Sequence, residues 1–142
     1  MVHLARIPLA LLTVIVVAAI VVAPSGCGPA TGTVSGSVTV DGKPAASGVI
    51  SFIPADGAGA PVTVDIQGGE YTAQAVAGSK RVQISVPVVI GQRKEYNGPT
   101  APLVDITEES VPPKYNSETE LVFDLKRGAN SKDWTIEGVK KK

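Results

Sequence analysis

The stretch TVSGSVTVDGKPAASGVISFIP, residues 33–54, contains two short apolar runs separated by a turn. Up to Val40, Val and Gly alternate with Ser and Thr, and this period of two is typical of a half-buried strand. Asp41-Gly42 is a favoured two-residue hairpin turn. Pro54 ends the second run, because proline cannot donate a hydrogen bond to a sheet ladder. The stretch therefore predicts β-structure.

The same alternation continues toward the end of the chain. Further strands, separated by turns rich in Gly and Pro, are predicted at residues 62–66, 70–76, 80–89, 120–125 and 132–138. Pro87 restricts the late half of its strand to an edge or a bulge. Residues 91–119 hold four prolines and are predicted to be a long loop, in which Leu103–Ile106 forms either a brief strand or a flap. A turn is predicted at residues 127–130.

No window of the chain predicts an amphipathic helix after residue 26, so the fold class is all-β. About seven strands with turns every eight to twelve residues predict an antiparallel two-sheet sandwich over residues 33–138. Its core is expected to be mostly Val, Ile, Leu and Ala, with a few large side chains, namely Phe52, Tyr71, Phe123 and Trp134. Residues 139–142 form a basic tail.

The first 26 residues have the plan of a secretory signal peptide, which we expect to be helical. Arg6 supplies a positive charge, residues 7–23 are uncharged and almost entirely apolar, and small residues follow. A helix that spans a membrane needs about 20 apolar residues, and the run at 7–23 is shorter. A cleaved signal is therefore favoured over a permanent anchor. An uncleaved, single-pass membrane anchor stays open as an alternative.

Ser25-Gly26-Cys27 resembles the lipobox of bacterial lipoproteins, although Pro24 stands where an aliphatic residue is usual. The resemblance implies cleavage before Cys27 and attachment of lipid to its thiol. Gly28, rather than an aspartate, favours the outer membrane if the sorting rule of Gram-negative lipoproteins applies. Residues 27–32 would then be a tether. The alternative is a chance cysteine near an ordinary signal cleavage site.

Composition excludes several function classes. The chain holds 13 Lys and Arg against 13 Asp and Glu, so it lacks the basic stripe of a nucleic-acid binder. One cysteine cannot form an internal disulfide. The one histidine, His3, lies in the signal, which leaves the domain without a base for Ser-His catalysis or a histidine ligand for zinc.

The remaining candidates for chemistry are weak. Ser79 and Lys80 are neighbours on a predicted strand and so point to opposite faces. Acidic residues at 56, 105, 108 and 109 lack the spacing of a calcium loop and are expected to be solvated. We therefore expect no catalytic residues, no metal site and no cofactor.

Three segments resemble carboxypeptidase-regulatory-like, transthyretin-like domains: residues 33–54, residues 68–86 (GGEYTAQAVAGSKRVQISV) and residues 111–130 (VPPKYNSETELVFDLKRGAN). The last is similar to the closing part of small envelope lipoproteins of Planctomycetes-type bacteria. The resemblance implies a transthyretin-like or immunoglobulin-like sandwich that acts as an accessory module. It implies no peptidase activity.

These observations predict a non-enzymatic, lipid-anchored module of the cell envelope, facing the periplasm or the exterior. Its loops 54–61 and 91–119 would be presented to an envelope protein or a glycan. The candidate contacts are Arg93, Tyr96 and Tyr115, although for Tyr115 the structural role of a corner tyrosine is favoured over partner contact. A purely structural component of the envelope, without a discrete ligand, is the alternative function.

Overall fold

The computed structural model describes residues 28–140, and this part of the chain is all-β, as predicted. The predicted signal peptide and Cys27 lie outside the described residues. The described chain contains one 3-10 helix, η1 (Pro113–Tyr115), and eleven strands: β1 (Thr31–Val40), β2 (Lys43–Pro44), β3 (Ser47–Pro54), β4 (Val62–Gln67), β5 (Glu70–Val76), β6 (Gly78–Ser85), β7 (Pro87–Lys94), β8 (Leu103–Glu109), β9 (Val122–Leu125), β10 (Gly128–Ser131) and β11 (Trp134–Ile136).

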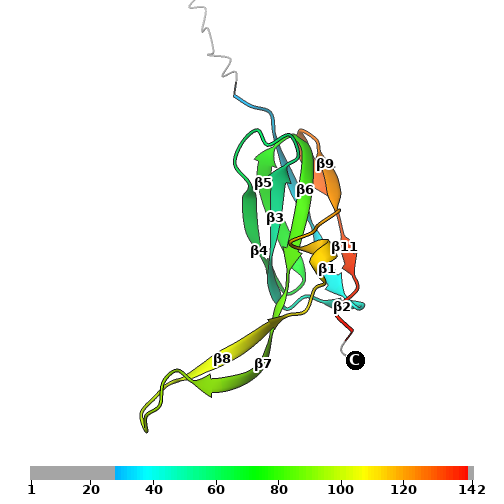
Figure 1. The fold of residues 1–142 in the computed structure, drawn as a ribbon. Helices are drawn as coiled ribbons and strands as arrows, with labels where there is room; N and C mark the ends of the chain where they lie inside the picture. The colour runs from blue at the N-terminus through cyan, green and yellow to red at the C-terminus, as the bar shows by residue number, and fades with distance from the viewer. Residues whose placement is uncertain (1–27, 141–142) are drawn as a thin grey trace, which may run out of the picture.

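Nine strands belong to one curled sheet, and β7 and β8 form a small second sheet (Figure 1). The order in the large sheet is β10-β1-β5-β4-β3-β6-β9, with β2 and β11 also paired to β1. Gly68 and Gly69 close the predicted hairpin with φ values of 60° and 82°. Across it, β4 and β5 pair only at Gln67 and Glu70, so the sheet bends here into two layers.

The two ends of this sheet are consecutive in the chain. A link of two residues, 126 and 127, connects edge strand β9 to edge strand β10 and spans at most about 11 Å. The sheet therefore curls until its ends are near each other, and the result is broadly sandwich-like. The predicted sandwich is confirmed in its broad form, but one curled sheet supplies both layers, and the described chain has more strands than the seven expected.

The hydrophobic core lies between the layers. Phe52 and Tyr71 are buried as predicted, with ring centroids 6.0 Å apart. Trp134 is also buried, whereas Phe123 is only partly buried. The two rings pack edge to face, with their centroids 6.5 Å apart. Aliphatic residues at alternate positions complete the core, and those fully buried are Val34, Val38, Ile50, Ile66, Val82, Ile84, Val111, Leu125 and Ile136.

Most strand pairs are antiparallel, as predicted, but β10 and β11 run parallel to β1. Residues 32–35 of β1 pair with β10, and residues 38–40 pair with β11. The predicted turn at residues 127–130 is thus largely strand, and the strand predicted at 132–138 shortens to Trp134–Ile136. Alternation along one segment carries no information about the direction of the strand beside it.

The connection between β10 and β11 lies tightly against β1. The Lys132 amide donates a hydrogen bond to the Ser35 carbonyl at 3.0 Å. Asp133 accepts hydrogen bonds from the Ser37 amide at 2.8 Å and from the Ser37 hydroxyl at 3.0 Å. A Cβ atom on Gly36 would lie 1.9 Å from the Lys132 carbonyl oxygen. Glycine is therefore the residue that permits this approach.

A buried tyrosine forms hydrogen bonds with the same connection from the core side. The Tyr71 hydroxyl donates to the Lys132 carbonyl at 2.7 Å and accepts from the Trp134 indole nitrogen at 3.1 Å. Burial raises the pKa of Tyr71 to about 12, and the nearby Asp133 carboxylate adds to the increase, while the hydrogen bond from Trp134 opposes it. The phenol therefore remains neutral and keeps its role as a donor.

Stability is expected to fall in acid partly through Asp133. The two hydrogen bonds from Ser37 hold the pKa of this carboxyl below its usual range. A lower pKa in the folded state stabilises the fold above the unfolded-state pKa, and this contribution disappears as the pH falls through the folded-state pKa. Urea unfolding from about pH 5 to about pH 3 should show a steeper loss for the natural chain than for Asp133→Asn. Equal slopes would contradict this assignment.

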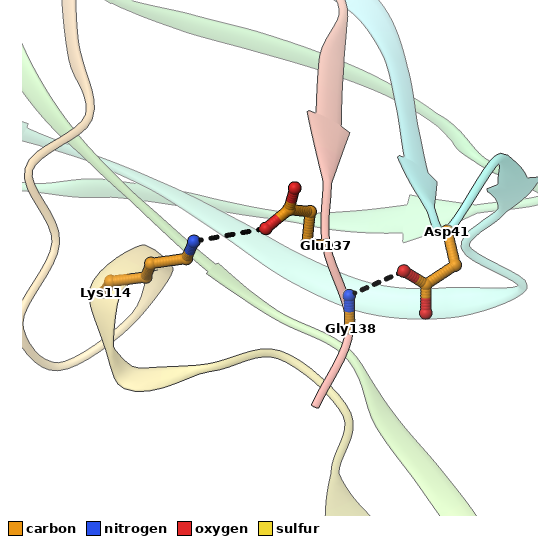
Figure 2. A network of polar contacts seen from close by, with 4 residues as sticks. All are labelled: Asp41, Lys114, Glu137 and Gly138. Carbon is orange, nitrogen blue, oxygen red and sulfur yellow. Dashed lines mark hydrogen bonds and ion pairs between the residues drawn. The ribbon is translucent and has the colours of Figure 1, made fainter. Parts of the chain in front are cut away.

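The C-terminal strand, β11, ends beside the predicted hairpin turn at Asp41-Gly42. Asp41 and Gly42 both have positive φ values, 51° and 79°, as a two-residue hairpin turn requires. The Asp41 carboxylate also accepts a hydrogen bond from the Gly138 amide at 3.0 Å. Beside it, Lys114 forms an exposed ion pair with Glu137 at 3.4 Å (Figure 2). The Asp41 side chain thus connects the first turn to the segment that follows β11.

Candidate functional site

β7 and β8 leave the sandwich together and form a projecting ribbon, residues 87–109, which we call the arm (Figure 1). The two strands pair from Pro87–Glu109 at the root to Lys94–Leu103 near the tip. Within the described chain they form no extended contact with another element. A two-stranded ribbon is only marginally stable alone in water. Because the arm does not pack on the core, the needs of the core do not explain the sequence of the arm.

The arm replaces two features predicted from the sequence. The strand predicted at 80–89 ends at Ser85, and Pro87 begins a new strand that turns away from the sandwich. The brief strand considered at Leu103–Ile106 is real and longer, reaching Glu109. Much of the predicted loop 91–119 is therefore ordered β-structure.

The arm exposes aliphatic side chains on both faces. Val89 is 59% exposed and Leu103 is 61% exposed, and Val88, Ile90 and Ile106 are exposed as well. A β-bulge at Ile90 shifts the pairing register by one residue between Val89 and Gly91. Cross-strand partners share a face, so one face carries Val88, Gly91, Arg93, Val104, Ile106 and Glu108, and the other carries Val89, Gln92, Lys94, Leu103, Asp105 and Thr107.

The arm also offers backbone edges. Each of its two strands has a single strand neighbour in the described part of the chain, so the outer edge of each strand is unpaired by any other strand. Such edges are templates for pairing with another chain. Exposed aliphatic residues beside an open edge are typical of an interaction surface.

The root of the arm is held by Glu109. Its carboxylate accepts hydrogen bonds from the Val86 amide at 2.8 Å, the Val111 amide at 3.2 Å, the Ser85 hydroxyl at 2.5 Å and the Asn116 side chain at 3.3 Å. The expectation that this acid is a solvated loop charge was wrong. The network crosses from the sandwich to the arm and therefore fixes the direction in which the arm leaves.

Two of the three predicted contact residues lie toward the tip of the arm. Arg93 is exposed on β7 opposite Val104. Tyr96 lies in the connection between the strands and is 54% exposed. Beside them, the Lys94 ammonium donates to the Gly98 carbonyl at 3.3 Å, which closes the tip. The structure thus brings Arg93 and Tyr96 onto one element.

Tyr115 does not belong to this group. It lies on η1, after the arm has returned to the sandwich, and is partly buried against the core. The Lys114 ammonium lies 4.7 Å from the centroid of its ring. Tyr115 therefore lies outside the arm surface, with its ring packed against the core.

The other predicted loop, 54–61, borders a cavity of about 380 Å³ at the end of the sandwich where β1 begins. We call it the Lys80 cavity, after the charged residue among its lining residues, which are Thr31, Pro54, Ala58, Gly59, Ala60, Val62, Gln74, Ala75, Val76 and Lys80. Lys80 is only 4% exposed. The alternation of β6, which places position 80 in phase with Val82, is the signal that could have found it.

Other classes of site find little support in the described residues. In residues 28–140 no group of three or more His, Cys, Asp or Glu side chains is placed to hold a metal ion. The same residues contain no helix with the length and apolar character needed to cross a membrane.

Comparison with known proteins does not assign the chain to a family. No family model matches it, and neither the curated proteins nor the solved structures give a significant match. The function must therefore be argued from the geometry of the arm and the cavity.

Proposed function

We propose that this chain is a non-catalytic module of the bacterial cell envelope, attached to a membrane through lipid on Cys27, that binds a protein partner through the arm. The observation that carries the proposal is the placement of the arm. It projects from the end of the sandwich opposite to the end where β1 begins (Figure 1).

The position of β1 relates this placement to the membrane. β1 begins at Thr31, four residues after Cys27, which at full extension is at most about 14 Å of chain. A lipid on Cys27 would hold this end of the sandwich close to the membrane surface. The arm would then point away from the membrane, where a partner can reach it.

The chemistry of the arm favours a protein over a glycan as the partner. Its open backbone edges fit an extended peptide segment that pairs as a further strand, and its aliphatic residues fit apolar side chains on that segment. Tyr96 is the one aromatic residue within residues 87–109, so the arm offers a sugar a single ring for stacking. Arg93 and Lys94 near the tip favour an acidic residue at that end of the segment.

The resemblance to carboxypeptidase-regulatory-like domains belongs to the same proposal. The hairpin at Asp41-Gly42, the end of β3 at Pro54 and the hairpin at Gly68-Gly69 support it, because they occur where that resemblance predicts them. An accessory module of this kind would bind and not catalyse.

Photo-crosslinking in intact cells tests the proposal. A photoreactive phenylalanine at Val89 or Leu103 should crosslink to one and the same protein, whereas the equally exposed Val122 on β9 should not. Val89→Asp, combined with the probe at Leu103, should reduce that product at least tenfold because it places a charge in the apolar contact. Arg93→Ala and Tyr96→Ala should weaken it less.

Three other crosslinking results would change or contradict the proposal. A product with a second copy of the chain replaces the foreign partner by self-association. An equal yield at Val122, or no product at any arm position, contradicts binding through the arm and leaves a structural component of the envelope. The intact mass of the chain from the membrane fraction tests the anchor separately, since an unmodified chain that does not begin at Cys27 excludes the lipid.

A further inference from the structure

The Lys80 cavity combines an apolar wall with a single buried cation. Most of its wall is small and aliphatic and comes from the ends of β3 and β5, the start of β4 and the loop 55–61, while Thr31 and Gln74 add polar groups. At about 380 Å³ its size falls at the lower end of the range of small-molecule sites. The cavity is distant from the arm, so the proposed partner does not account for it.

Lys80 occupies a core-facing position. On β6 the exposed residues Ser79 and Arg81 alternate with Lys80, Val82 and Ile84, which are buried. A charge inside a protein is costly unless it is compensated, so a lysine at such a position is usually paired. An aliphatic residue would satisfy the packing equally well.

The Lys80 ammonium has no partner among the described residues. Between residues 28 and 140 neither a hydrogen bond nor an ion pair is made by its side chain. In this part of the chain, every side-chain nitrogen that is fully buried has a hydrogen-bond partner. Because the Lys80 ammonium has none, it must keep some solvent-accessible surface. Lys80 is also one of the residues that line the cavity, so a ligand there would lie against its side chain.

We propose that the Lys80 cavity binds an alkyl carboxylate, with the carboxylate on the Lys80 ammonium and the alkyl chain along Ala58, Val62 and Val76. A charge-assisted hydrogen bond would satisfy the buried cation, and the apolar wall would cover the chain. One lysine matches one negative charge. A phosphate, which carries close to two charges at neutral pH, fits this site less well.

Chemical-shift titration of the isotope-labelled full chain, held in nanodiscs of zwitterionic lipid, tests this proposal with octanoate as the probe. Octanoate should shift the amide signals of Ala58 and Val76 in a saturable way. Octanol, which has the same alkyl length and no charge, and acetate, which has the charge and almost no chain, should each bind at least tenfold more weakly.

Two variants separate the buried cation from general charge effects. Lys80→Met keeps the length of the side chain and should weaken octanoate binding at least tenfold. Arg81→Met removes the same charge from the exposed neighbour and should leave binding within twofold. The proposal is overturned if octanol binds as well as octanoate, if Lys80→Met retains binding, or if octanoate produces no saturable shift. The expected differences among the probes and between the variants depend neither on a lipid at Cys27 nor on a partner of the arm.

Discussion

Replacement of Glu109 by alanine is expected to destabilise the domain by about 3 kcal/mol and to release the arm from its fixed direction. The carboxylate serves four donors, two of which are the backbone amides of Val86 and Val111. Alanine leaves these groups without their acceptor, and partly buried donors lose more free energy than the net value of a hydrogen bond suggests.

Urea unfolding measures the loss, and amide hydrogen exchange locates it. Exchange should accelerate most along β7, β8 and residues 110–116, and least in β3 and β6. Asp105→Ala is the matched control, since Asp105 lies on the same strand and accepts only from Gln92 within the arm. It should cost about 0.5 kcal/mol. Equal effects of the two substitutions would show that Glu109 does not hold the root.

Gly36→Ala, made alone, should lower the free energy of unfolding by a comparable amount, about 2–4 kcal/mol. The added Cβ would overlap the Lys132 carbonyl oxygen at 1.9 Å and approach an Asp133 carboxylate oxygen at 3.1 Å. The obstacle is backbone that is already bonded to Ser35 and Tyr71, so it cannot move without breaking those hydrogen bonds. The alanine therefore separates the β10–β11 connection from β1.

The control for this substitution is Gly91→Ala in the arm, where the nearest atom to the new Cβ is on Ile106 at 4.0 Å. It should change the unfolding free energy by less than about 0.5 kcal/mol. Thermal unfolding of both variants beside the natural chain is sufficient. A Gly36→Ala protein that melts with the natural chain would mean that this crossing is looser than the contacts indicate.

The parts of the fold that the sequence predicted well are those determined by neighbouring residues. Asp41-Gly42 and Gly68-Gly69 can adopt the left-handed conformations that hairpins need, so the strands around them follow directly. The arm was not predicted, because the prolines in residues 91–119 indicate a loop and because alternation at residues 80–89 does not show where a strand leaves the sandwich. Val89 and Leu103 have the residue types of a core strand, and only the tertiary structure shows that no second layer covers them.

The candidate site shows the same limit. Arg93 and Tyr96 were placed in an exposed segment correctly, because charged and aromatic residues near Pro and Gly indicate a surface turn. Glu109 was missed, since its four donors come from residues whose proximity only the folded root creates. Lys80 was within reach of the sequence, because its position in the alternating strand already predicted an inward side chain.

The pairing of β1 has a mechanical consequence. This strand is bonded along one side to β5 and along the other to β10 and then β11, over nearly its whole length. If the chain is attached to a membrane just before Thr31, tension on the tether acts along the strand axis and loads these hydrogen bonds in shear, all at once. A strand held in this way resists extraction far better than one whose bonds open singly, so a pull between a membrane and a partner on the arm would be borne by the first strand of the domain.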